Sequence, residues 1–183
     1  MAAMAPDPTL GTDRQLDFHP AMGMRWEITR STDDTAGELF ESTNWLDPRM
    51  AASPRHFHPN AESFEVIEGS LEVWKDGRWN TVGAGETATA PVGTRHTFRN
   101  SSSEPTTIIT RFRPATRSEA FFRHMHKLIQ QGKIKRLPPK DARSAIYSSM
   151  LISAYSDEFH ATGPMGVVLR ATSLLGKALR FQI

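Results

Sequence analysis

The sequence predicts a mainly β fold, an antiparallel sandwich or barrel, followed by a helical C-terminal region. Between residues 24 and 113, short runs of alternating or β-branched residues are separated by turns rich in Gly and Pro. After Pro114 the apolar residues recur at helical spacing instead. At 183 residues the chain is expected to form one domain with a sizeable core.

Three regions follow from these patterns. Residues 1–16 are rich in Ala, Pro, Asp and Thr and are expected to be poorly ordered. Residues 17–115 are expected to form the β-barrel, and residues 116–183 a helical extension that packs on the barrel or on a dimer partner. Charge supports the second boundary, because residues 1–115 hold 11 Lys/Arg and 16 Asp/Glu, whereas residues 116–183 hold 11 and 4. The two halves either neutralise each other, or the tail meets an anionic partner.

Turn residues delimit the expected strands. Asp76-Gly77 predicts a two-residue hairpin, because both central positions of that turn need a positive φ. Gly69, Gly83-Ala84-Gly85 and Pro91-Val92-Gly93 mark further turns. The strands are expected at 24–30, 38–46, 62–68, 70–75, 78–82, 87–90, 96–99 and 106–112.

Three helices are expected after the barrel: 118–131, 140–155 and 165 to about 179. Ser118 is a plausible N-cap of the first, and Gly132 the residue after its C-cap. The last helix is apolar except for one narrow polar stripe. That stripe consists of Arg170, Ser173, Lys177 and Arg180. A helix this apolar must cover the barrel, a second subunit or a membrane surface, and we expect one of the first two.

Several classes of function are disfavoured. No run approaches the ~18 apolar residues of a membrane span, and residues 1–12 lack the order of a secretory signal. The absence of cysteine excludes disulfides, thiolate metal sites and cysteine nucleophiles, and it fits a cytoplasmic protein. No zinc finger, RNA-recognition motif or block of Lys/Arg points to a nucleic-acid partner.

Four residues carry the chemistry. His56 and His58 are two apart, so an extended chain points both imidazoles to one face. Glu62 begins a strand just after them, and His96 begins a distant one. Taken singly, each is more often a surface or core residue than a ligand. If their strands are neighbours, however, three imidazoles and one carboxylate converge on a point. This donor set suits Fe(II), Mn(II), Co(II), Ni(II), Cu(II) or Zn(II) and leaves one or two coordination positions open.

The same residues carry a resemblance to a known family. The chain resembles the cupin superfamily, whose paired motifs are G(X)5HXH(X)3–4E(X)6G and G(X)5PXG(X)2H(X)3N. It matches every fixed position from His56 to Gly69 and from Gly85 to Asn100, but Met50 replaces the first Gly. The resemblance spans residues 24–114, and the short gap between the motifs is typical of compact single-domain microbial cupins. It implies a jelly-roll β-barrel with His56, His58, Glu62 and His96 as metal ligands.

The resemblance implies a metal-dependent enzyme that acts on a small organic molecule. We expect an oxidoreductase of the dioxygenase type, in which one divalent ion, Fe(II) for preference, holds substrate and O₂. Glu62 is both a ligand and the expected catalytic group, because it can exchange a proton. One alternative is a non-redox isomerase, epimerase, cyclase or lyase that uses the metal as a Lewis acid. Another is a small-molecule-binding protein without turnover, since a fold does not fix its chemistry.

Weaker expectations concern the pocket wall and the assembly. Phe64 and Phe98 each lie two positions beyond an expected ligand, so both should face the interior, where they either line a substrate pocket or fill the core. Arg111 binds a substrate carboxylate or phenolate only if its face of the last strand points inward. A homodimer is expected, because cupin barrels commonly pair and the apolar last helix adds a surface to bury.

Overall fold

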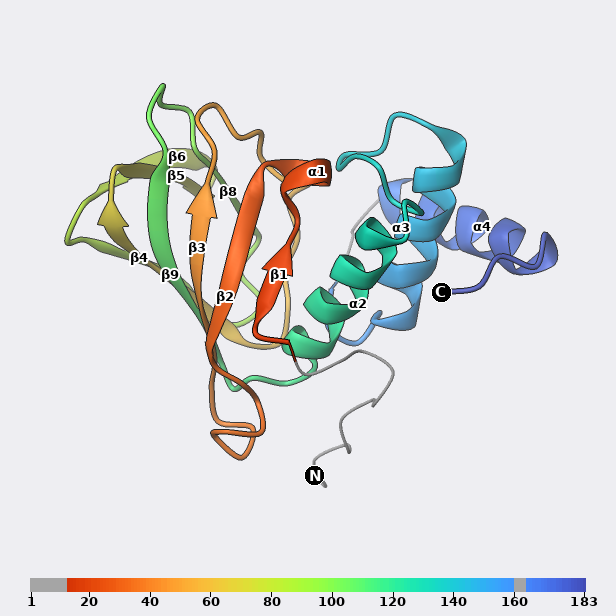
Figure 1. Cartoon of the computed structure of the whole chain (residues 1–183), viewed down its shortest axis with the longest axis horizontal. Coiled ribbons are helices and arrows are strands. Elements are labelled where there is room, and N and C mark those ends of the chain that lie inside the picture. Colours follow the sequence, from red (N-terminus) through yellow and green to blue (C-terminus); the bar gives the residue numbers. More distant parts are fainter. Residues whose placement is uncertain (1–12, 160–163) are drawn as a thin grey trace.

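The computed structural model describes residues 13–159 and 164–183. Within these residues, nine strands form two antiparallel sheets, and helices follow them (Figure 1). This confirms the predicted mainly β class with a helical C-terminal region. The strands are β1 Gln15–Asp17, β2 Met24–Arg30, β3 Phe40–Leu46, β4 Ala61–Glu68, β5 Ser70–Lys75, β6 Arg78–Gly83, β7 Thr87–Ala90, β8 His96–Arg99 and β9 Thr106–Arg113. The helices are α1 His19–Met22, α2 Ser118–Gln130, α3 Ala142–Ala154 and α4 Pro164–Ala178.

The larger sheet has the strand order β1-β2-β3-β9-β4-β7, and the smaller one the order β6-β5-β8. Every pairing is antiparallel. The predicted hairpin at Asp76-Gly77 joins β5 to β6, with φ values of 55° and 84° at those two residues. The alternation of apolar and polar residues along β2, β4 and β9 turns one face of the large sheet toward the core.

Two different elements cover the inner face of the large sheet. At one end the small sheet packs on it, and Phe98 of β8 lies 5.1 Å from Phe64 of β4 between ring centroids. At the other end α2 takes the place of a sheet, because Phe122 contacts Trp26 of β2 at 4.3 Å and Phe112 of β9 at 5.6 Å. The first helix of the extension thus completes the core of the β-structure.

The beginning of the chain differs from the expectation. Disorder was expected over residues 1–16, of which 1–12 lie outside the described residues. Gln15 and Leu16, however, belong to β1, which pairs with β2. Leu16 is buried, and Phe18 beyond it packs edge-on against Trp26. The sequence signal was missed because a three-residue strand is too short to show periodicity.

Two helix ends also differ from the expectation. Arg117, not Ser118, is the N-cap of α2, and no side chain caps the helix there. The Ser118 hydroxyl instead accepts a hydrogen bond from the Asn60 side chain at 2.7 Å, so it is already engaged. Helix α3 begins after Asp141, whose carboxylate accepts the backbone N–H of Ser144.

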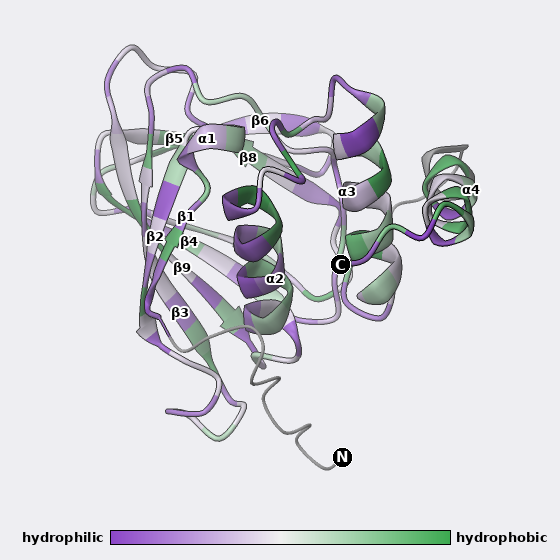
Figure 2. Cartoon of the chain, turned by 45° about the vertical axis from the view of Figure 1, so that its right-hand side comes forward, coloured by the Kyte–Doolittle hydropathy of each residue, from purple (hydrophilic) through white to green (hydrophobic). Residues whose placement is uncertain are grey.

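Helix α4 packs on α3 and lies at the edge of the molecule, farther from the sheets than α3 (Figures 1 and 2). Its buried side is the small-residue side: Ser173 is 3% exposed, and a Cβ added to Gly176 would lie 2.6 Å from a methyl carbon of Ile146. Part of the expected polar stripe is therefore the packed face. The exposed face carries Val168, Leu174, Leu175 and Leu179. None of the helices in the described parts of the chain is long and apolar enough to cross a membrane.

Candidate metal centre

The two sheets and a loop bring His56, His58, Glu62 and His96 together. Glu62 lies near the start of β4 in the large sheet, and His96 opens β8 in the small one. His56 forms an isolated antiparallel bridge with His96, with backbone N–H to carbonyl distances of 3.1 and 2.9 Å. This bridge ties the loop before β4 to the small sheet. The three segments meet because the large sheet and the small sheet face each other at this point.

The four donor groups are compact and mostly buried. One ligand atom from each residue lies within 4.8 Å of all the others. His58 and His96 are 1% exposed and Glu62 is 4% exposed, while His56 is half-buried. The Glu62 carboxylate oxygen Oε2 is 3.0 Å from Nε2 of His58 and 2.8 Å from Nε2 of His96. A cluster of this composition can hold one metal ion.

Backbone carbonyls orient the histidine rings through their second nitrogen. Nδ1 of His56 lies 2.9 Å from the carbonyl oxygen of Pro54, and Nδ1 of His58 lies 2.9 Å from that of Asn60. Nδ1 of His96 lies 2.7 Å from the carbonyl of Thr94. A carbonyl only accepts hydrogen bonds, so each Nδ1 donates. Such contacts fix the tautomer and leave Nε2 as the metal-binding atom.

The donor set fits a divalent cation. A neutral imidazole carries only one N–H, which the carbonyls already engage in His58 and His96. Both Nε2 atoms nevertheless point at the same oxygen of Glu62. Either each Nε2 carries an additional proton, or one cation lies between the two Nε2 atoms and the carboxylate and replaces both protons. Three imidazoles and one carboxylate suit a first-row transition metal, and they do not distinguish among such metals.

Electrostatics prepares the cluster for such a cation. Burial works against the charged form of Glu62, but hydrogen bonds with His58 and His96 outweigh it and lower its pKa to about 2. Burial and the nearby charge of His96 lower the pKa of His56 to about 4. For His96, burial lowers the pKa, but the hydrogen bond and charge of Glu62 outweigh it and raise the pKa. At neutral pH the carboxylate is therefore ionised and His56 is neutral, as metal ligands must be.

Phenylalanine rings form the wall around the histidines. Phe64 is fully buried, with its ring centroid 6.3 Å from that of His96, and Phe98 packs on Phe64 as a half-buried neighbour. Phe112 of β9 lies 5.7 Å from His58. Phe159, from the segment after α3, lies 5.7 Å from His56 and 5.9 Å from His58.

Arg111 does not reach this interior. Its side chain lies on the opposite face of β9 from Phe112, where it donates to Glu41 at 2.6 Å and to Glu65 at 2.7 Å. The condition for a substrate contact of Arg111, an inward-pointing side chain, is therefore not met. The β-branched pattern of the strand allowed either face to point inward, and the two glutamates on neighbouring strands stabilise the outward one.

Two buried asparagines, Asn60 and Asn100, hold loops of the two motifs in place and were not predicted as site residues. The Asn60 side chain donates to the hydroxyls of Thr116 and Ser118, while the backbone carbonyl of Asn60 accepts from Nδ1 of His58. Asn60 thus joins a histidine to the start of α2. Asn100, the last residue of the second motif, donates to the carbonyls of Asp47 and Glu104 and so closes the loop before β9.

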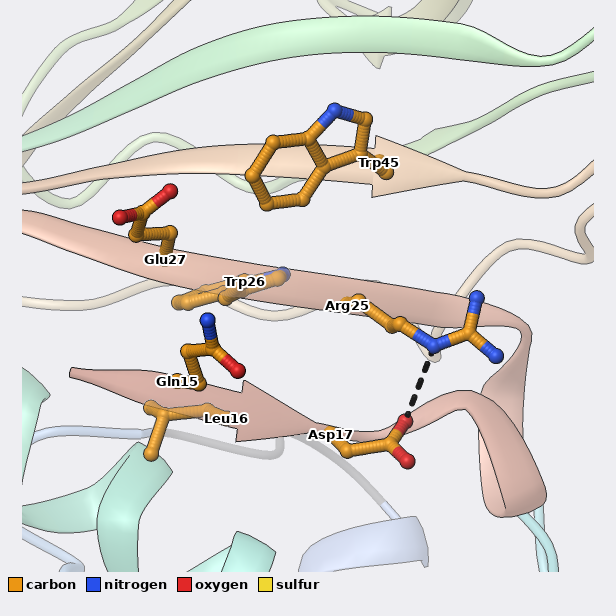
Figure 3. A pocket seen from close by; sticks show the side chains of 7 residues that line it. All are labelled: Gln15, Leu16, Asp17, Arg25, Trp26, Glu27 and Trp45. Atoms are coloured by element: carbon orange, nitrogen blue, oxygen red, sulfur yellow. Dashed lines mark ion pairs between the residues drawn. The ribbon is translucent and has the colours of Figure 1, made fainter. Parts of the chain in front are cut away.

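A surface hollow of about 420 Å³ lies elsewhere, against β1, β2 and β3 (Figure 3). Its lining includes Gln15, Arg25, Glu27 and the exposed Trp45, and Asp17 forms an ion pair with Arg25 at 3.6 Å. None of the four clustered residues lines it. The hollow is open to solvent, and we assign no chemistry to it.

Comparisons with known proteins cover the same region. A family model described as "Cupin domain" matches residues 46–112. None of the curated proteins matches the sequence. Similar solved structures include KdgF from Halomonas sp., which is 23% identical with a TM-score of 0.46 and aligns over 55% of this chain and 86% of that one.

Two other solved structures align over a similar share of the chain. A Cupin_2 domain of an XRE family transcriptional regulator from Enterobacter cloacae is 26% identical, with a TM-score of 0.44 over 50% of this chain and 96% of that one. An RmlC-like cupin from Shewanella frigidimarina NCIMB 400 is 21% identical, with a TM-score of 0.48 over 59% of this chain and 89% of that one.

Proposed function

Because residues 46–112 are a cupin domain that encloses a buried His/Glu cluster, we propose that the protein is a metal-dependent enzyme acting on a small organic molecule, an oxidoreductase of the dioxygenase type. His56, His58, Glu62 and His96 are the proposed ligands of one divalent metal ion, with Fe(II) favoured. The observation that carries this proposal is the convergence of four donor atoms within 4.8 Å. Bound there, the ion would polarise a substrate oxygen and supply electrons to O₂.

The charge of the cluster indicates the kind of ligand it takes. One carboxylate among four donors leaves a divalent ion with a net charge of +1. A buried net charge is costly unless it is neutralised. A monoanionic substrate, such as a carboxylate, an enolate or a phenolate, would neutralise it. The surrounding phenylalanines would pack against the apolar part of that substrate and exclude water from it.

The chain's own residues limit the acid–base chemistry. Among the described residues outside the cluster, the side chains in ring contact with the histidines are Phe64, Phe112 and Phe159, which carry no proton to exchange. With a pKa of about 2, Glu62 is ionised at neutral pH, so it is suited to be a metal ligand and is not a proton donor.

The first test is the metal content of the purified protein beside the double variant His56→Ala/His58→Ala. About one equivalent of a transition metal is expected in the wild type and none in the double variant. His19→Ala is the matched control, because His19 is exposed on α1 and pairs with Asp47 away from the cluster. Absence of metal from the wild type, even after reconstitution, would contradict the proposal.

Oxygen uptake then separates redox from non-redox chemistry. The metal-loaded protein is incubated with phenolic or diketone carboxylates under air and under nitrogen. Substrate loss that requires air and consumes O₂ supports a dioxygenase. Substrate loss under nitrogen contradicts it and leaves an isomerase or lyase. Binding without any turnover leaves a non-catalytic binding protein.

We further propose that the protein is a cytoplasmic homodimer. The exposed face of α4 supports the dimer, because Val168, Leu174, Leu175 and Leu179 are each more than half exposed on one helix. Contiguous apolar surface of this kind typically marks an interface. A chain without cysteine is suited to a reducing compartment.

A further inference from the structure

The wall over the histidines includes a residue from outside the cupin domain. Phe159 follows α3, whereas the match to the domain model ends at residue 112. Its ring centroid lies 5.7 Å from that of His56 and 5.9 Å from that of His58. The Phe159 side chain is only 9% exposed, so it is buried against the histidine rings and is not a surface residue. The helical extension therefore contributes directly to the surroundings of the cluster.

The segment that carries Phe159 is fastened to the β-structure by buried and ionic contacts. The carboxylate of Glu158, 4% exposed, accepts the Thr116 hydroxyl at 2.6 Å and the Arg117 backbone N–H at 2.9 Å. The Arg117 guanidinium pairs with Asp157 at 2.9 Å and lies 4.5 Å above the Tyr155 ring. These contacts join the segment before Phe159 to the turn between β9 and α2. They thereby hold Phe159 in place.

Phe159 continues an aromatic wall that begins in the barrel. Its centroid lies 4.0 Å from that of Phe121 and 5.9 Å from that of Phe122, both on α2. Phe122 in turn contacts Phe112, which contacts His58. Rings at these distances leave no room for a further ring between them. The size of the space beside His56 and His58 therefore depends on the Phe159 side chain, which belongs to the extension.

We propose that Phe159 is a specificity-determining residue that restricts ligands of the metal centre to those without a bulky group on the side of His56 and His58. This inference rests on the proposed function, because it assumes that the cluster holds a metal with an open position. Replacement of Phe159 by Ala would leave a cavity about the size of its ring, lined by Phe121, Phe122 and the histidines. A space of that size, bordered on one side by phenylalanine rings, is large enough for a benzene-sized group.

The experiment uses the full-length protein loaded with Co(II), whose visible absorption changes when an anion binds. Acetate and benzoate serve as probes, because both offer one carboxylate and differ by a phenyl ring. The wild type is expected to bind acetate at least tenfold more tightly than benzoate. Phe159→Ala is expected to raise the benzoate affinity at least tenfold and to keep the acetate affinity within threefold.

Phe181→Ala is the control variant, because Phe181 is an aromatic residue of the same extension that packs on Tyr147. It should leave both affinities unchanged. If Phe159→Ala does not fold, as judged by circular dichroism, Phe159→Leu replaces it, with a rise of about threefold in benzoate affinity expected. The absorption titration reports ligand binding and does not depend on turnover.

The possible results distinguish this inference from the proposed function. If the wild type binds no Co(II), both are overturned. If Co(II) binds but the preference between acetate and benzoate is the same in the wild type and in the Phe159 variant, only the role of Phe159 is overturned. An equal rise in both affinities also overturns it, because that result indicates general loosening of the site. A selective gain for benzoate supports it.

Discussion

At the scale of single residues, the site is arranged by short-range backbone contacts. The histidines are oriented by carbonyls two residues away: Pro54 for His56, Asn60 for His58 and Thr94 for His96. Each ring is thus positioned by its own loop, and only the meeting of the loops depends on the fold. Preorganised ligands of this kind lose little conformational freedom when a metal binds.

Gly69, which follows the end of β4 opposite to Glu62, offers a test of backbone fit. Its φ is +82°, and an added Cβ would lie 2.7 Å from the Pro105 carbonyl oxygen. Gly69→Ala should lower the free energy of unfolding by about 3 kcal/mol, because the left-handed backbone and the close contact both resist a side chain. Gly77 has a similar φ of +84° but open space around it, so Gly77→Ala should cost only about 1 kcal/mol. Equal losses in urea denaturation would contradict this account.

Arg111 gives a pH-dependent prediction. Burial works against ionised Glu41, but the hydrogen bonds from Arg111 and Thr29 and the charge of Arg111 together outweigh it and lower the pKa of Glu41. A lowered carboxylate pKa adds stability above the unfolded-state value near 4.5, and this stability is lost as the pH falls through the lowered pKa. Arg111→Met should therefore destabilise the protein by about 1 kcal/mol at pH 7 and by less at pH 3.

Thermal unfolding at both pH values checks this, with Arg113→Met at the exposed end of β9 as the control. The Arg111 variant should retain its metal and its affinity for acetate. Loss of acetate binding would show that Arg111 does contact the ligand, contrary to its placement on the outer face.

The sequence predicted the four clustered residues and the inward-facing Phe64 and Phe98, but not the rest of their surroundings. The two motifs are defined by fixed intervals along the chain, so the sequence alone identifies His56, His58, Glu62 and His96. Phe159 gave no such signal, since its contact with His56 depends on how α2 and α3 pack. The orientation of Arg111 did not follow from the sequence for a related reason. Alternation shows which residues share a face of a strand, but not which face is buried.

At the scale of elements, α4 shows how packing can override composition. Its apolar residues were expected to be covered, yet the small residues Ser173 and Gly176 are the ones that face α3. Small side chains allow two helices to approach closely, which brings Ile146 and Met150 of α3 against the α4 backbone. The amphipathic pattern alone does not reveal such a contact, because it registers hydrophobicity and not size. Most strands, in contrast, lie within two residues of their predicted bounds, since Gly and Pro turns delimit them.

Gly176→Leu tests the contact between α3 and α4. Leu is the better helix former, so the substitution would stabilise an isolated helix by almost 1 kcal/mol. In the protein it should instead lower the free energy of unfolding by about 1–3 kcal/mol, because the side chain collides with Ile146 and Met150. Hydrogen exchange should show reduced protection in α4. Ala178→Leu, on the exposed side of the same helix, should change the stability by less than about 0.5 kcal/mol.

At the scale of the whole molecule, the exposed side of α4 determines the expected assembly. Leu174→Glu/Leu175→Glu should convert a homodimer into a monomer, because it places charge on a surface that is otherwise apolar. Light scattering at micromolar concentration measures the change. Lys177→Glu alters the net charge by the same two units without removing an apolar side chain, and it should leave the dimer intact. A wild-type protein that is already monomeric would contradict the proposed dimer.

The position of β9 has a consequence for the order in which the chain can fold during synthesis. This strand is the last of the nine in sequence, but it lies between β3 and β4 and hydrogen-bonds to both. The large sheet therefore cannot close until the ribosome has released residue 113. The aromatic face of β2 and β3 stays uncovered for longer, because Phe122 can pack on it only after α2 has left the ribosome. A nascent chain that stops before α2 thus exposes Trp26 and Phe40, and it is the species on which a chaperone would act.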